Sequence, residues 1–78
     1  MKYVVHYDKY KSIDKMASMK ITFDASSDRN AADKASGLVK KAERAFNQNI
    51  ANPFYHWTFV KTGLYKVKQD EVLIPVTA

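Results

Sequence analysis

Hydrophobic and polar residues alternate along the first third of the chain, which is the pattern of β-strands with one buried face. The segment from Lys2 to Asp8 places Tyr3, Val5 and Tyr7 on one side. The segment from Met16 to Ala25 alternates most regularly, and Ala17, Met19, Ile21, Phe23 and Ala25 share a side. We predict two strands here, joined by a long, mobile connection from Lys9 to Lys15.

A helical period follows the second strand. Ser26-Ser27-Asp28 offers oxygen acceptors for free backbone N–H groups and a negative charge for the positive end of a helix dipole. The apolar positions are then three and four residues apart and occupy one sector of a helix: Ala31, Ala35, Leu38, Ala42, Ala45 and Phe46, flanked by Ala32 and Val39. Asn47-Gln48-Asn49 and Pro53 end the pattern. The sequence predicts one amphipathic helix.

Extended patterns return in the last third of the chain. We predict strands from Phe54 to Val60, from Leu64 to Lys68 and from Val72 to Val76, with turns at Thr62-Gly63 and at 69–71. The last strand is expected at a sheet edge, because Pro75 has no N–H to donate. The predicted fold is a single α+β domain over residues 1–78, a two-layer sandwich with one amphipathic helix on a four- to five-stranded antiparallel sheet, in the order ββαββ(β).

Two registers are open for the hairpin near Gly63. A two-residue loop would place Trp57 and Phe59 beside Lys66 and Lys68, which makes a platform for stacking bases. A three-residue loop, Lys61 to Gly63 with Gly63 left-handed, would pair Phe59 with Tyr65 and Trp57 with Val67, leaving the lysines on the other face. We favour the second register, because burying an aromatic side chain contributes about 1.5–3 kcal/mol.

Composition narrows the class of protein. Thirteen Lys and Arg residues against eight Asp and Glu give a net charge of +5, which favours anionic partners such as nucleic acid or an acidic protein surface. The chain has no cysteine, and no apolar stretch long enough for a signal peptide or a membrane span. We therefore expect a cytoplasmic protein that does not bind membranes.

Candidate chemistry is sparse. His6 and His56 could meet across the open sheet face, but no third metal ligand accompanies them, and they are interpreted as surface histidines. Gly37 and Gly63 are too far apart for a phosphate-binding loop. The spacing supports no set of nucleophile, base and orienting residue. We expect no catalytic residue, no metal and no cofactor.

Basic residues are the candidate binding groups. Arg29, Lys40, Lys41 and Arg44 fall on the helix side opposite the apolar stripe, next to Gly37. Lys2, Lys20, Lys66 and Lys68 are expected on the open sheet face in the favoured register. Tyr10, exposed in the first connection, is a further candidate contact. Either basic surface could bind phosphates or acidic side chains. The alternative is that both are ordinary solvent-exposed surfaces that keep the protein soluble.

The layout resembles small phage-encoded inhibitors of host defence, anti-CRISPR proteins among them. The segments that carry the resemblance are KYVVHY, MKITFDA, the helix SSDRNAADKASGLVKKAERAF and the segment WTFVKTGLYKV. The resemblance implies a stoichiometric inhibitor that covers a nucleic-acid-binding surface or another host interface in the host cytoplasm. The basic charge departs from DNA-mimicking inhibitors, which are acidic.

Three functions follow from these features. The first is a non-catalytic binding protein that docks on a host protein or nucleoprotein complex through its basic surfaces. The second is a module that binds DNA or RNA phosphates directly through helix or sheet lysines. The third is a structural homo-oligomer, a homodimer paired through the C-terminal edge strand, Val72 to Val76.

Overall fold

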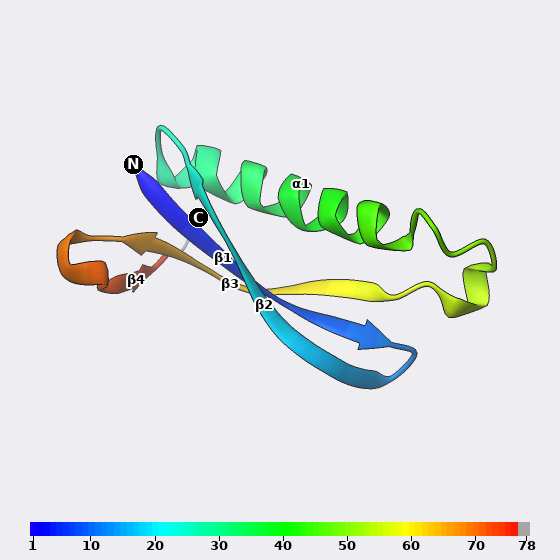
Figure 1. Ribbon diagram of the computed structural model, residues 1–78. Coiled ribbons are helices and arrows are strands. Elements are labelled where there is room, and N and C mark those ends of the chain that lie inside the picture. The colour runs from blue at the N-terminus through cyan, green and yellow to red at the C-terminus, as the bar shows by residue number, and fades with distance from the viewer. Residues whose placement is uncertain (77–78) are drawn as a thin grey trace.

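The computed structural model describes residues 1–76 and shows one long helix lying along one face of a four-stranded antiparallel sheet (Figure 1). The elements are β1 (Lys2–Lys11), β2 (Asp14–Asp24), α1 (Asp28–Asn47), β3 (Thr58–Val67) and β4 (Leu73–Pro75), with 3₁₀ turns at Pro53–Tyr55 and Gln69–Glu71. The sheet order is β2-β1-β3-β4. The predicted α+β class, with one helix on an antiparallel sheet, is confirmed.

The first two strands form a longer hairpin than predicted. β1 continues to Lys11 and β2 begins at Asp14, so that the turn contains only Ser12, with a φ of 58°, and Ile13. Asp8 supports the hairpin by accepting a 2.8 Å hydrogen bond from the Ser18 hydroxyl. The predicted mobile connection from Lys9 to Lys15 is therefore wrong, because backbone pairing extends into a polar stretch that has no apolar face to signal it.

The core lies between α1 and one face of the sheet. Alternate residues of β1 supply its centre: Tyr3 and Val5 are fully buried, and Tyr7 is nearly so. Ala31, Ala35 and Val39 of α1 and Phe59 and Leu64 of β3 complete the buried cluster. The predicted alternation of β1 is found, and the small alanine side chains let the helix lie close to the strands. The predicted apolar stripe of α1 is buried or half-buried as far as Ala42, whereas Ala45 and Phe46 at its end are exposed.

β3 is one continuous strand, so the predicted hairpin at Thr62-Gly63 does not exist. Lys61 is opposite Tyr7 and Gly63 is opposite His6, which leaves Thr62 as an extra residue. An extra residue in one strand of a pair is a β-bulge. Gly63 has no positive φ. A continuous β3 pairs with β1 from Tyr3 to Tyr10. Part of this backbone pairing would be lost if the chain turned back at Thr62-Gly63.

The bulge reverses the alternation of β3, so the favoured register is wrong. The other register placed Phe59 and Lys66 on one face, as the structure does, but the hairpin that it required is absent. Phe59 before the bulge and Leu64 after it are both buried under α1. Lys66 is opposite the core residue Tyr3, and Tyr65 is opposite Val4. Directly opposite residues share a face. Lys66 therefore lies on the helix side of the sheet and Tyr65 on the open side, the reverse of the prediction.

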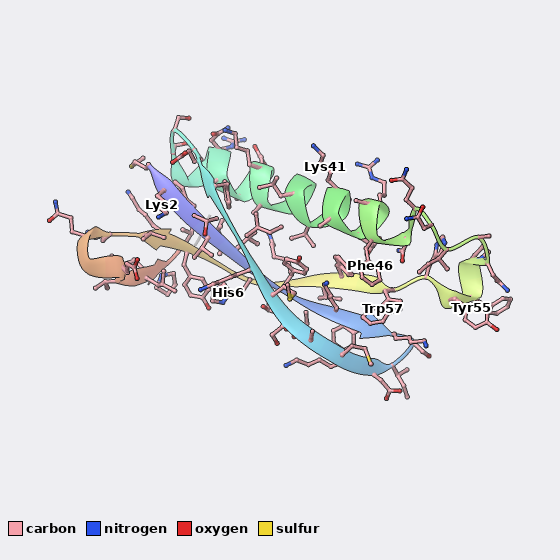
Figure 2. The ribbon with its side chains drawn as sticks, in the orientation of Figure 1. Lys2, His6, Lys41, Phe46, Tyr55 and Trp57 are labelled. Atoms are coloured by element: carbon pink, nitrogen blue, oxygen red, sulfur yellow. The ribbon has the colours of Figure 1, made fainter. Side chains whose placement is uncertain are left out.

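Trp57 precedes β3 and packs at the far end of the core. The predicted strand from Phe54 to Val60 is wrong in its first half, because residues 53–55 form a 3₁₀ turn. The Asn47 side chain forms two hydrogen bonds with the backbone of Trp57: Nδ2 donates to the Trp57 carbonyl at 2.9 Å, and Oδ1 accepts from the Trp57 N–H at 2.9 Å. The Trp57 and Phe46 rings are 4.8 Å apart (Figure 2). Trp57 is thus half-buried against the core.

Polar contacts cap α1 at its start and attach it to β3 near its end. Ser27 is the N-cap, and its hydroxyl accepts from the Asn30 N–H at 3.1 Å. Glu43, near the other end, accepts from the Phe59 N–H at 2.8 Å.

In the part of the chain that the structure describes, no helix is long and apolar enough to cross a membrane.

The predicted C-terminal edge strand is present but short. β4 spans three residues at the end of the sheet beside β3. Pro75 is opposite Tyr65, and the Val76 N–H donates to the Leu64 carbonyl at 2.9 Å. The exposed edge therefore offers few free backbone groups to a second chain.

Candidate functional site

The outer face of α1 carries four exposed cations: Arg29, Lys40, Lys41 and Arg44. Successive helix residues are 100° apart, so these positions lie away from the buried Ala35. Figure 2 shows Lys41 directed away from the sheet. Within the described residues the only ion pair joins Lys15 to Asp8, and none of the four α1 cations forms a hydrogen bond. Their charges are available to an external partner.

The carboxylates of α1 do little to neutralise this face. Asp28 accepts a hydrogen bond from Tyr3, and Glu43 is turned toward β3 by its bond to Phe59. Asp33 is exposed, but it is closer to Arg29 than to the last turns of the helix. The segment from Gly37 to Arg44 therefore presents only positive charge outward. A Cβ added at Gly37 would meet nothing within 4 Å, so the surface there is open.

The open face of the sheet holds a shallow pocket of about 190 Å³. Its lining residues come from all four strands and from the turn before β4: Lys2, Val4, His6, Lys20, Thr22, Val67, Glu71 and Leu73. Two of the predicted open-face lysines, Lys2 and Lys20, are brought together here.

The other two predicted lysines of the open face are elsewhere. Lys66 is on the helix side, opposite Tyr3, so its expected place beside Lys20 is wrong. Lys68 follows the end of β3 as the first residue before a 3₁₀ turn. The sequence-based grouping fails because residues beyond a bulge exchange faces.

Tyr10 and the histidines are also placed differently from expectation. Tyr10 is not in a loop; it is a half-buried residue of β1, opposite Lys15 and Thr58. His6 packs on Tyr65, with ring centroids 4.8 Å apart, whereas the His56 ring is 2.7 Å from the Ile50 carbonyl. The two histidines do not meet. Among the described residues no cluster of three His, Cys, Asp or Glu could hold a metal ion.

Two surface features were missed by reasoning from sequence. The Tyr65 ring covers Gly63 so closely that a Cβ there would be 2.8 Å from the Tyr65 hydroxyl. An isolated glycine in a strand pattern is the available signal for such a bulge. The second feature is just before β3, where Phe54 is 94% exposed. The available sequence signal for this exposed segment is Asn52-Pro53, which begins the 3₁₀ turn.

One pKa shift bears on the structure of the helix start. The Tyr3 hydroxyl donates to Asp28 Oδ1 at 2.7 Å. This hydrogen bond, with burial and the carboxylate charge as lesser causes, raises the pKa of Tyr3 to about 12. Tyr3 is therefore a neutral structural donor at physiological pH.

Comparison with protein-family models, with curated proteins and with solved structures gave no match for this chain. Its function is therefore argued from the geometry of its own surfaces.

Proposed function

We propose that this protein is a non-catalytic nucleic-acid-binding module that contacts phosphates through the outer face of α1. The observation that carries the proposal is the set of exposed, unpaired cations Lys40, Lys41 and Arg44, with Arg29 about three helical turns before them. Neutralising phosphates with such side chains releases condensed counterions, which favours binding. A helix is also narrow enough to enter the major groove of B-DNA.

The composition of this face favours phosphates over an acidic protein surface. Protein interfaces are built around buried apolar or aromatic anchors. The outward positions from Gly37 to Arg44 include no exposed large hydrophobic residue; the nearest one on α1 is Phe46, which packs against Trp57. Phosphate contacts need no such anchor, because they are charge-assisted hydrogen bonds.

The test compares two double variants that lower the net charge equally. Lys40→Gln/Arg44→Gln removes charge from the outer face, and Lys11→Gln/Lys68→Gln removes it from exposed positions outside α1. Binding of a fluorescent DNA duplex, a fluorescent RNA duplex and a fluorescent single strand is measured by anisotropy at low salt. We expect the α1 variant to bind about tenfold more weakly than wild type and the control to stay close to wild type. Equal losses of affinity in both variants would show that only the net charge matters, and not the α1 face. An absence of binding at low salt would contradict the proposal.

A second candidate function is docking on a protein, and a different surface supports it. Phe54 is 94% exposed, Tyr55 is 61% exposed, and Ile13 stands at the tip of the β1–β2 hairpin. Aromatic anchors of this kind dominate protein interfaces. An anti-CRISPR-like inhibitor acting on a host nucleoprotein complex in the cytoplasm would use this end for its protein contacts. Phe54→Ser should then abolish co-purification of a partner that survives nuclease treatment, and retention of that partner by the variant would argue against this role.

A further inference from the structure

The pocket on the open sheet face is built by segments that are distant in sequence. Lys2 and Val4 belong to β1, Lys20 and Thr22 to β2, and Leu73 to β4. Figure 2 shows Lys2 at the end of the sheet away from Trp57 and Tyr55, and His6 between them near the middle of the sheet. The pocket is therefore separate from the exposed aromatic end, and the sheet lies between it and the outer face of α1.

The charges on the lining favour an anion. Lys20 and His6 are directly opposite each other on β2 and β1, so their side chains are neighbours on the open face. Within the described residues, the side chains of Lys2, Lys20 and His6 form neither an ion pair nor a hydrogen bond. Of the lining residues that the structure describes, Glu71 is the carboxylate. Two ammonium groups and an imidazole thus face one carboxylate.

Three of the residues that line the pocket are apolar, and the lining residue His6 contacts an aromatic ring. Val4 is only 4% exposed although no helix covers this face, and Val67 and Leu73 flank the space. His6 packs on Tyr65 at a centroid distance of 4.8 Å and an interplanar angle of 48°. Nucleobases stack on aromatic side chains, and the His6 ring is the aromatic group that lines this pocket. A volume of about 190 Å³ is below the roughly 300 Å³ at which pockets for drug-sized molecules begin, so a nucleotide would be only partly enclosed here.

We propose that this pocket binds one nucleoside monophosphate unit. Lys2 and Lys20 would receive the phosphate, and the base would lie over Val4 beside the His6 ring. The Glu71 carboxylate would accept from an amino or hydroxyl group of the ligand. A free nucleotide and the phosphorylated end of a strand share this chemistry. The proposal does not depend on the role of the α1 face, from which the site is separated by the sheet.

The test is a titration of the ¹⁵N-labelled full chain with AMP, followed by two-dimensional NMR. We expect AMP to shift the amide signals of Val4, His6, Thr22 and Val67, while adenosine and inorganic phosphate bind more weakly. Lys20→Gln should weaken AMP binding about tenfold. Lys11→Gln, an exposed lysine of β1 outside the pocket, should leave it unchanged. A 5′-phosphorylated oligonucleotide that binds more tightly than AMP would identify the strand end as the source, and one that binds more weakly would identify the free nucleotide.

Three results would overturn the proposal. AMP could shift no signal at millimolar concentration, or its shifts could centre on α1 instead of the pocket. Equal effects of Lys20→Gln and Lys11→Gln would also contradict it. Circular dichroism checks that both variants fold, which their exposed positions favour. Duplex binding by the α1 variants is read separately, so that failure at one site leaves the other result intact.

Discussion

The hydroxyl of Tyr3 donates a 2.7 Å hydrogen bond to the carboxylate of Asp28, and so joins the buried face of β1 to the first turn of α1. Tyr3 is fully buried under the helix. Asp28 also carries the negative charge that stabilises a helix N-terminus. The contact therefore orients the helix over the sheet, and with it the cations on the opposite side of α1.

Removing this hydrogen bond should lower stability in a pH-dependent way. The folded-state pKa of Tyr3 is about 12 against an ordinary value of 10.0. A raised folded-state pKa stabilises the fold fully below pH 10, and the contribution is lost as pH rises from 10 through 12. Tyr3→Phe should lower the urea midpoint at pH 8 and show a smaller further loss between pH 10 and 12 than wild type. Tyr55→Phe, at an exposed site, is the control, and identical pH profiles for wild type and Tyr3→Phe would contradict this role.

The Asn47 side chain should contribute measurably to stability. It forms two hydrogen bonds with the backbone of Trp57, both 2.9 Å long. Each such bond is worth about 1 kcal/mol net, so Asn47→Ala should lower the free energy of unfolding by about 2 kcal/mol. Asn49→Ala, two residues later and exposed, should change it by less than about 0.5 kcal/mol. Urea denaturation followed by Trp57 fluorescence measures both, and equal small effects would show that Trp57 is held by packing alone.

The two glycines should respond to alanine in opposite directions. A Cβ at Gly37 would enter open space, so Gly37→Ala should raise the free energy of unfolding by about 0.5–1 kcal/mol. A Cβ at Gly63 would be 2.8 Å from the Tyr65 hydroxyl, so the Tyr65 ring must move away from it. Gly63→Ala should therefore destabilise the fold and shift the His6 ring signals in NMR. Stabilisation by Gly63→Ala would mean that the ring adjusts freely.

The parts of the fold that could be predicted from sequence are those with many repeats of one period. The alternation through Tyr3, Val5 and Tyr7 and the stripe through Ala31, Ala35 and Val39 each specify a buried face several times over, and both faces are buried in the structure. The outward cations of α1 follow from the same helical geometry. Their exposure was therefore predictable.

The parts that could not be predicted depend on single residues. Thr62-Gly63 suits a hairpin turn as well as a bulge, and the choice depends on the length of β1, which pairs along nearly all of β3. One extra residue exchanges the faces of Tyr65 and Lys66, so the pocket on the open face was beyond sequence reasoning. The run Phe54 to Trp57 has strand-like composition, but the Asn52 side chain accepts from the Phe54 N–H at 3.0 Å and starts a 3₁₀ turn instead.

The salt dependence of duplex binding tests the central claim most directly. The logarithm of the binding constant for a DNA duplex is plotted against the logarithm of salt concentration for wild type, Lys40→Gln/Arg44→Gln and Lys11→Gln/Lys68→Gln. Each phosphate contact contributes a slope of about −0.9, so losing two contacts should make the slope of the α1 variant shallower by about 1.8, while the control keeps the wild-type slope. The same slope in all three proteins would contradict phosphate binding by the outer face of α1.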